Sequence, residues 1–371
     1  MRIAVVGGGL QGIEVSYLAQ KAGWEVILFD RRSPVPAQGL CPNFVQADVE
    51  KTPRLDRLFS HVDLVIPALE NSAALARLSQ WQQSPGTHTP LAFDMAAYQI
   101  SACKHTSNQV FARLGLPLPQ AWPECSFPVV VKPKGESGSN GVMICHDKAA
   151  LDRVDRACDP VIQEFITGPS YSIEVIGLPG RYTPFQVTRL EMDKGYDCKR
   201  VLAPADLSTD RIKAFERMAR TVAQAVGLKG IMDLEVIRHN GQLKLLEIDA
   251  RFPSQTPMAV YHATGVNLVQ ALAEIVIPLG ARAPQPSRKR FVILEHLQVK
   301  GTTLTVAGEH IMKQHGLQVQ KNFFGADEAI TNYAQDKKTW VATLIVSDAH
   351  AEAAWEKRGQ VLEMIQAQCC A

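Results

Sequence analysis

The chain has 371 residues, of which 46% are hydrophobic and 20% are charged, and its formal net charge is +2. This composition is typical of a globular protein of two or three domains, and it indicates neither a nucleic-acid surface nor a basic membrane patch. No segment approaches the ~20 apolar residues of a membrane span. An expected strand directly after Met1 leaves no room for a signal peptide, and the scattered cysteines indicate reduced thiols in a cytoplasmic protein.

The first hundred residues alternate apolar strands with helices. We expect strands at Arg2–Val6, Glu25–Asp30, Phe44–Ala47 and Leu64–Leu69, and helices at Gly12–Ala22 and Arg54–Ser60. Such alternation predicts an α/β fold with a parallel, doubly wound sheet. We therefore expect residues 1–100 to form an amino-terminal, Rossmann-like domain.

The remainder is predicted to form two further units, residues 101–175 and residues 176–371, with a linker near residues 281–290. The expected helices are 107–114, 148–158, Thr209–Val226 and Ala351–Gln368. The expected strands are Val129–Lys132, Val142–Cys145, Val161–Phe165, Ser172–Ile176, two acidic strands near residues 230–249, Phe291–Val299 and Trp340–Val346.

A glycine-rich turn, Gly7-Gly-Gly-Leu-Gln-Gly12, joins the first strand to the first helix, and Asp30 ends the second strand. This is the context of a dinucleotide fingerprint, in which amides meet a phosphate and the acid meets a ribose. Alternatively, the glycines permit a tight turn beside a crevice that binds another ligand. The rest of the chain favours this second interpretation.

Three further segments have residue types suited to nucleotide binding. Lys132 precedes a Gly/Ser-rich loop, Gly135–Gly141, whose amides could form an anion-binding nest. Lys104 is a second candidate phosphate ligand, and the backbone of Gln163–Ile166 could contact an adenine ring. Each has an ordinary alternative: a plain hairpin, a solvent-exposed lysine and a strand that ends in a turn.

Two strands carry an unusual concentration of acids, in Lys229-Gly-Ile-Met-Asp-Leu-Glu235 and in the run that starts at Glu247. Residues two apart in a strand share a face, so Asp233 lies beside Glu235, and Glu247 lies beside Asp249 and Arg251. Acids this close repel one another unless a cation lies between them. Carboxylates and phosphate oxygens are suitable ligands for Mg²⁺. The alternative is a solvated hairpin of alternating charge.

The order of these features resembles the ATP-grasp superfamily, which holds ATP between two subdomains and activates a carboxylate as an acyl phosphate. The order is a phosphate lysine, a lysine before a Gly/Ser loop, a Glu-Phe-Ile hinge, and acidic strands that end in an arginine. The resemblance covers the chain from its first glycine turn to about residue 280. It implies an ATP-grasp fold, ATP and Mg²⁺ as cofactors, and ADP as a product.

Within the superfamily, the segments Lys229–Glu235 and Glu247–Pro257 are similar to the ligases of pyrrolysine biosynthesis. The segments Gly8–Gly12, Tyr196–Cys198 and Glu295–Leu297 support that similarity. It implies a ligase that joins the α-carboxylate of (3R)-3-methyl-D-ornithine to the ε-amine of L-lysine. These small molecules would be its partners, with a homodimer left open.

The resemblance also implies roles for individual residues. The expected ATP contacts are Lys104, Lys132, Ser139, Gln163, Glu164, Phe165 and Ile166. The expected Mg²⁺ ligands are Glu235, Glu247 and Asp249. The expected catalytic residues are Arg251 and Lys132. The expected substrate contacts are Leu10, Gln11, Glu70, Ser172, Ile173, Glu174, Asp233, Arg251, Ser254 and Glu309. Ser170 stands where many relatives have a ribose-binding glutamate, which leaves the ribose contact open.

Three other functions remain compatible with the sequence. The first is an ATP-grasp ligase with another carboxylate or amine. The second is an NAD-dependent dehydrogenase that uses Gly7 to Asp30. The third is a nucleotide-binding module without catalytic activity.

Overall fold

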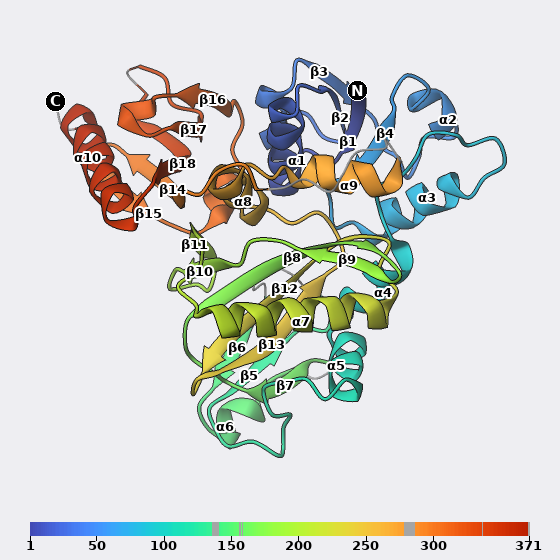
Figure 1. The fold of residues 1–371 in the computed structure, drawn as a ribbon, viewed down its shortest axis with the longest axis vertical. Helices are drawn as coiled ribbons and strands as arrows, with labels where there is room; N and C mark the ends of the chain where they lie inside the picture. The colour runs from blue at the N-terminus through green and yellow to red at the C-terminus, as the bar shows by residue number, and fades with distance from the viewer. Residues whose placement is uncertain (136–140, 156, 158, 278–285, 336, 370–371) are drawn as a thin grey trace.

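The structure is a computed structural model, and it describes residues 1–135, 141–155, 157, 159–277, 286–335 and 337–369. Within these residues the strands form sheets of four, eleven and three strands. The amino-terminal region lies beside the carboxyl-terminal region, and the central region extends away from both (Figure 1). The predicted α/β fold with an amino-terminal parallel sheet is confirmed.

The amino-terminal sheet has the strand order β3-β2-β1-β4, and every neighbouring pair in it is parallel. Its strands are β1 (Arg2–Val6), β2 (Glu25–Asp30), β3 (Asn43–Gln46) and β4 (Leu64–Pro67). Its helices and turns are α1 (Leu10–Lys21), η1 (Pro36–Leu40), α2 (Leu55–Leu58) and α3 (Ser72–Gln82). The expected strands are confirmed to within two residues at either end. Helix α3, whose Asn71 cap accepts the Ala74 N–H, was not foreseen.

The smallest sheet has the order β6-β5-β7 and consists of β5 (Val129–Lys132), β6 (Met143–Cys145) and β7 (Val161–Glu164). Helices α4 (Met95–Ser101) and α5 (Lys104–Arg113) precede it, and α6 (Lys148–Leu151) follows β6. The expected helix over residues 148–158 is confirmed only as far as Leu151 and is wrong for residues 152–155; residues 156 and 158 lie outside the described residues. After Leu151 the N–H groups of Arg153 and Val154 bond three residues back, which tightens the chain into turns.

The largest sheet follows the order β13-β12-β8-β10-β11-β14-β18-β17-β16, with β9 paired to β8 and β15 paired to β14. Its central strands are β8 (Ser170–Leu178), β9 (Arg181–Pro184), β10 (Thr188–Met192), β11 (Cys198–Ala203), β12 (Gly230–His239) and β13 (Gln242–Asp249). Helix α7 (Thr209–Val226) lies across the strands β8 and β12 (Figure 1). Both acidic strands and helix α7 agree with the prediction, whereas β9, β10 and β11 were not foreseen.

The carboxyl-terminal region continues the same sheet. It contains β14 (Phe291–Lys300), β15 (Thr303–Val306), η2 (Glu309–Met312), β16 (Gln318–Lys321), η3 (Phe323–Gly325), β17 (Glu328–Thr331), β18 (Thr339–Asp348) and α10 (Ala351–Cys369). Buried Glu295 of β14 accepts hydrogen bonds from Arg200 of β11 and Arg358 of α10, at 2.6 Å each. This ion-pair network ties α10 to the sheet.

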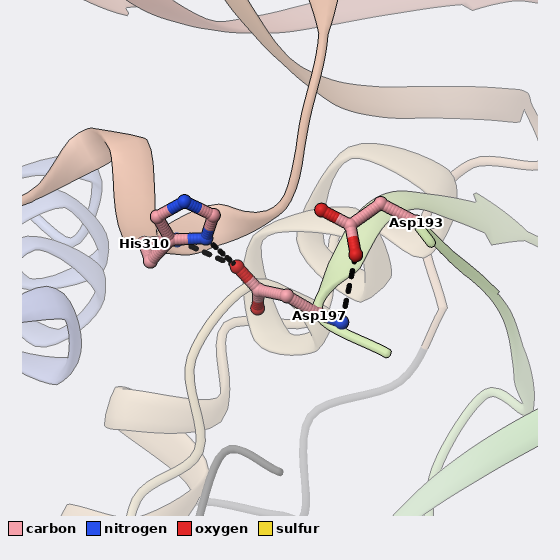
Figure 2. A group of neighbouring side chains, drawn as sticks. All are labelled: Asp193, Asp197 and His310. Atoms are coloured by element: carbon pink, nitrogen blue, oxygen red, sulfur yellow. Dashed lines mark hydrogen bonds and ion pairs between the residues drawn. The ribbon is translucent and has the colours of Figure 1, made fainter. Parts of the chain in front are cut away.

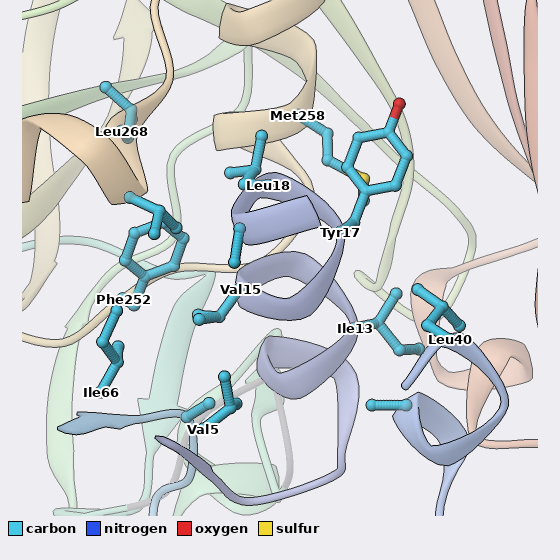
Figure 3. Packing of buried hydrophobic residues seen from close by; sticks show 14 of the residues in the cluster. Val5, Ile13, Val15, Tyr17, Leu18, Leu40, Ile66, Phe252, Met258 and Leu268 are labelled. Carbon is cyan, nitrogen blue, oxygen red and sulfur yellow. The ribbon is translucent and has the colours of Figure 1, made fainter. Parts of the chain in front are cut away.

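Helices α8 (Thr256–Thr264) and α9 (Leu268–Val276) join the amino-terminal region to the large sheet. Figure 3 shows α1 packed among Phe252, Met258 of α8 and Leu268 of α9. Every residue of α1 from Gln11 to Ala19 is buried, as in a helix covered on all sides. One apolar core therefore contains residues from both sides of the first predicted domain limit, near residue 100. The predicted domain limits stay a prediction. Residues 281–285, the first half of the expected linker, lie outside the described residues. Among the described helices, none has the length and apolar character needed to span a membrane.

Candidate active site

The acids predicted to share a face do so, because of how β13, β12 and β8 pair. Asp233 of β12 stands opposite Asp249 of β13 and Glu174 of β8. Two residues further along β12, Glu235 stands opposite Glu247 of β13 and Ser172 of β8. Directly opposite residues in an antiparallel sheet point to the same face. The result is two adjacent rows of polar side chains, which we call the acid rows: Asp249, Asp233 and Glu174, then Glu247, Glu235 and Ser172.

The other face of the same strands is apolar. Met232, Leu234 and Val236 alternate with the acids of β12 and pack with Phe215 of α7. Ile173 belongs to that apolar cluster and is fully buried in it. The predicted substrate contact of Ile173 is therefore wrong for its side chain, since residues 172 and 174 point the opposite way.

Burial and mutual repulsion raise the pKa values of several acids in the rows. Burial first, then Glu247 and Asp249, raise the pKa of Glu235 to about 8. Burial raises the pKa of Asp249 to about 6, with Arg251 partly offsetting it. Burial, Asp249 and Glu235 raise the pKa of Asp233 well above its ordinary value. The carboxyl groups of these acids lie so close together that binding of an added cation is favoured.

Glu247 differs from its neighbours, because two lysines face it. Lys104 Nζ lies 3.3 Å from a Glu247 carboxylate oxygen. Burial acts to raise the pKa of Glu247, but Lys104 and Lys132 outweigh it and hold the pKa below its ordinary value. Burial lowers the pKa of Lys132, with Glu247 opposing that shift. The two predicted phosphate lysines and one predicted metal ligand are thus neighbours.

A cavity of about 530 Å³ opens beside these lysines; we call it the nucleotide cavity. Its lining includes the predicted residues Lys104, Lys132, Gln163, Glu164, Phe165, Ile166, Glu235 and Glu247. Ser139, another predicted contact, lies outside the described residues. The Glu164 side chain is already engaged by Lys244 at 2.6 Å, and the N–H groups of Glu164 and Phe165 bond to Gln120 and Pro128. Those two amides are therefore not available to a base.

The sequence did not predict the second wall of the nucleotide cavity. Arg189–Asp193 and Tyr196 form this wall, on β10 and the turn after it. The Tyr196 ring stands edge-on to Phe165 with ring centres 6.4 Å apart. The sequence points to Tyr196-Asp-Cys198 only through the family resemblance. The residues around a turn do not indicate which cavity the turn faces.

A larger cavity of about 900 Å³, which we call the amino-terminal crevice, lies at the glycine turn. The predicted substrate contacts Leu10, Gln11, Glu70, Arg251, Ser254 and Glu309 all line it. Gln11 donates to Glu70 at 2.9 Å, and Arg251 binds Glu70 at 2.6 Å and Asp249 at 2.9 Å. This chain of contacts links the crevice to the acid rows.

The glycine turn uses Asp30 for its own structure. The two Asp30 carboxylate oxygens accept the N–H groups of Gly8 at 2.8 Å and Arg32 at 2.9 Å. Gly7 has a φ of +110°, which side chains rarely adopt. These contacts support the interpretation of the glycines as a tight turn rather than a ribose-binding fingerprint.

Several oxygens of the acid rows are buried without a partner among the described residues. They are the hydroxyl of Ser172, both carboxylate oxygens of Glu174 and one carboxylate oxygen of Asp233. Burial raises the pKa of Glu174 to about 7. Buried polar atoms nearly always find hydrogen-bond partners, so unpaired ones mark a place for a ligand. Glu174 and Asp233 are acceptors suited to a cationic group.

Comparisons with known proteins agree with this geometry. An ATP-grasp domain family model matches residues 102–255. A curated protein of Methanosarcina acetivorans, named 3-methyl-D-ornithine–L-lysine ligase, is 34% identical over 313 residues, or 84% of this chain and 83% of that protein. A protein of the same name from Methanosarcina mazei is also 34% identical over 313 residues.

Solved structures share the fold. The biotin carboxylase domain of the 2-oxoglutarate carboxylase of Hydrogenobacter thermophilus, a dimer in complex with MgADP, superposes with a TM-score of 0.76 at 15% identity. The alignment covers 98% of this chain and 89% of that domain. N5-carboxyaminoimidazole ribonucleotide synthetase of Thermotoga maritima gives a TM-score of 0.68 at 20% identity, with 98% of each chain covered.

The fold and the site define an ATP-dependent ligase, in which a nucleotide cavity meets paired acidic strands. The chain belongs to the ATP-grasp family and is an ADP-forming carboxylate–amine ligase. Over most of its length it closely resembles the curated 3-methyl-D-ornithine–L-lysine ligases. ATP-grasp enzymes use ATP with Mg²⁺ and act on small molecules, and the alternative of a dehydrogenase is not supported.

Proposed function

We propose that this enzyme joins the α-carboxylate of (3R)-3-methyl-D-ornithine to the ε-amine of L-lysine through an acyl phosphate, as a step of pyrrolysine biosynthesis. The observation that carries the proposal is the pair of buried acids, Glu174 and Asp233. Neither has an ion-pair partner among the described residues, and the Thr256 hydroxyl only partly offsets the effect of burial on Glu174. A diamino acid supplies two ammonium groups for them. The names of the 34%-identical relatives support the same pair of substrates.

In this proposal the nucleotide cavity holds ATP. Its apolar walls and the segment Gln163–Ile166 take the base, and Lys104 and Lys132 take the phosphates. Glu235, Glu247 and Asp249 would hold Mg²⁺, and their donor set fits a hard divalent cation. The raised pKa values of Glu235 and Asp249 support this fit, because an added cation would let both acids ionise. The metal would supply electrostatic stabilisation of the transferred phosphoryl group.

In the first chemical step a carboxylate oxygen of the diamino acid attacks the γ-phosphorus of ATP, the bond from that phosphorus to the β–γ bridging oxygen breaks, and ADP leaves. Ser172, Glu174, Asp233 and Ser254 grip the amines, which aims the carboxylate along the acid rows. Lys132 and Arg251 stabilise the negative charge that develops during transfer, since both are fixed in place before reaction. Arg251 is well suited, because its planar guanidinium already bridges Asp249 and Glu70.

The second step is attack of an amine on the acyl carbon, with departure of phosphate. L-lysine would lie in the amino-terminal crevice, with Leu10, Gln11, Glu70 and Glu309 around it. Ligands of open α/β sheets usually bind at the carboxyl ends of the strands, where this crevice lies. The amine must lose a proton before it attacks, since its ordinary pKa is ~10.4.

The test is an assay of ADP release with ATP, Mg²⁺ and pairs of amino acids. We expect release to require both L-lysine and either D-ornithine or its 3-methyl form, with a product mass equal to the amide. Glu247→Gln should abolish release, whereas Glu216→Gln, on the solvent side of α7, should not. ADP release that does not depend on lysine, or that requires another amine, would overturn the proposed substrates.

A further inference from the structure

Glu309, at the far end of the amino-terminal crevice, has its backbone clamped by two aspartates. The Gly308 N–H donates to Asp193 Oδ2 at 3.1 Å, and the His310 N–H donates to Asp197 Oδ2 at 3.0 Å. The His310 ring also contacts Asp197, as Figure 2 shows. The N–H groups of the residues on either side of Glu309 are therefore held by the turn between β10 and β11.

That turn is itself closed by hydrogen bonds. Asp193 Oδ1 accepts the N–H groups of Gly195 at 2.7 Å and Asp197 at 3.1 Å, and the Asp193 N–H donates to the Asp197 carbonyl at 2.8 Å. Burial acts to raise the pKa of Asp193, but these backbone donors outweigh it and hold the pKa below its ordinary value. Backbone groups thus use both oxygens of Asp193, so the cluster of two aspartates and a histidine is explained as a clamp.

The same turn separates the two cavities. Asp193 lines both of them, Tyr196 lines the nucleotide cavity, and Gly195 and Asp197 line the crevice.

The side chain of Glu309 is held from the opposite direction. Ser254 donates to it at 3.0 Å, and an interaction with the side chain of Gln255 acts to lower its pKa. Gln255 has φ 67° and ψ −54° and the Thr256 N–H bonds back to Ser254 at 2.8 Å, which together make a strained γ-turn. Such strain persists only where the surroundings impose it.

Two buried side chains impose the conformation of Gln255. Glu14 of α1 accepts its N–H at 3.1 Å, and His296 Nε2 lies 3.1 Å from its side-chain oxygen. Burial lowers the pKa of His296 to about 4, so the ring is neutral. Because the side-chain oxygen of Gln255 can only accept, the ring proton belongs on Nε2, and Nδ1 accepts from the Thr343 hydroxyl at 2.9 Å.

We propose that Asp197 and Gln255 are positioning residues that fix Glu309 for the attacking amine. Asp197 fixes the position of the Glu309 backbone through the clamp. Gln255 fixes the position of the Glu309 carboxylate through the γ-turn. This inference rests on the proposed function, because it gives the acid at the end of the crevice a cationic partner. It also makes affinity for the amine depend on a turn that the nucleotide cavity shares.

A steric variant tests the clamp without removing a charge. A Cβ at Gly308 would meet Asp197 Oδ2 at 2.0 Å, whereas a Cβ at Gly359 of α10 would meet nothing within 4 Å. Gly308 has a φ of −64°, so alanine is strained there only by lack of space. For Gly308→Ala we expect the KM for L-lysine to rise ~10-fold or more, the loss expected from one hydrogen bond to a charged group. The KM values for ATP and D-ornithine should stay within about twofold of the unaltered enzyme.

Asp197→Ala should raise the KM for L-lysine in the same way, and Asp197→Asn, which keeps one acceptor oxygen, should recover part of the loss. Gly359→Ala is the matched control and should leave all three KM values unchanged. Equal changes in the KM values for ATP and L-lysine, or no change in either variant, would overturn the proposal. Such a result would mean that the clamp serves only folding or has no effect.

Hydrogen exchange of the ligand-free protein separates this inference from the proposed function. If the clamp exists, the amide of His310, whose acceptor is Asp197, exchanges faster in Asp197→Ala than in the unaltered protein, and unchanged exchange rejects the clamp. Failure of the unaltered enzyme to release ADP with L-lysine rejects the proposed function instead. In that case the exchange measurement still decides whether the clamp holds Glu309.

Discussion

The two ends of the acid rows differ in what surrounds their carboxylates. Glu247, at the nucleotide cavity, faces Lys104 and Lys132, which hold its pKa below its ordinary value despite burial. Glu174, two strands away, has no ion-pair partner among the described residues, and burial raises its pKa to about 7, with the Thr256 hydroxyl only partly offsetting this shift. A glutamate is thus ionised beside two lysines at the nucleotide end, whereas a glutamate at the other end lies in a buried place suited to a cationic ligand.

The largest expected effect comes from removing a cation at the nucleotide end. For Lys132→Ala we expect kcat to fall ~10²–10³-fold, the usual consequence of losing one fixed group that stabilises developing charge. The measurement is steady-state ADP release at saturating substrates. Lys148→Ala is the control, because Lys148 belongs to the same small unit but is 75% exposed. Near-normal kcat in Lys132→Ala would mean that the phosphates are bound elsewhere and that the two ends do not differ as described.

At the other end, Glu174→Gln should raise the KM for the diamino acid by roughly 10–100-fold, because a hydrogen bond to a charged group is lost. The KM for ATP should change little. If both KM values rise together, Glu174 belongs to the nucleotide site, and the comparison fails.

The same variant should change the pH dependence of stability in the ligand-free protein. Burial raises the pKa of Glu174 from 4.5 to about 7, so the folded state binds this proton more tightly than the unfolded state. The stability that this proton provides is present below pH ~4.5 and is lost as the pH rises through ~7, with a limit of roughly 3 kcal/mol. The difference in unfolding free energy between Glu174→Gln and the unaltered protein should therefore grow from pH 5 to pH 8. Urea titrations at both pH values measure it, and a constant difference would contradict the burial of an unpaired acid.

The smallest effect is expected on the apolar face of the same strand. Ile173→Val should destabilise the protein by about 0.5–1.5 kcal/mol without changing any KM, since the side chain packs under α7. Thermal unfolding together with the ligase assay measures both quantities. A raised KM for the diamino acid would mean that Ile173 contacts the substrate, and that the apolar face of β8 also takes part in binding.

The sequence predicted much of the fold and of the candidate site because strand periodicity is local. Alternation along β12 separates Asp233 and Glu235 from Met232 and Leu234, and this pattern is visible without a structure. The lysine positions and the glycine turn also follow from motifs. The helix expected over residues 148–158 forms only at Lys148–Leu151 among the described residues, because composition does not reveal where turns replace α-helical hydrogen bonds.

Other features depend on pairing between distant segments. The sequence suggested a functional face for Ser172 and Glu174, but only the β8–β12 register sets Glu174 opposite Asp233. The contact of Asp193 with Gly308 and that of Glu14 with Gln255 join residues more than a hundred positions apart, and Gln255 and His296 are 41 positions apart. No local pattern distinguishes such residues from ordinary polar ones.

The sequence by itself determined which side chains could share a strand face, since this depends only on the two-residue repeat of a strand. It also determined the chemistry offered: carboxylates for a cation, lysines for phosphates and an arginine at the end. The tertiary structure decided which acids are paired and which are left unpartnered, because burial and neighbouring charge arise only when distant strands meet. That difference, rather than the number of acids, separates the nucleotide end of the site from the amino-acid end.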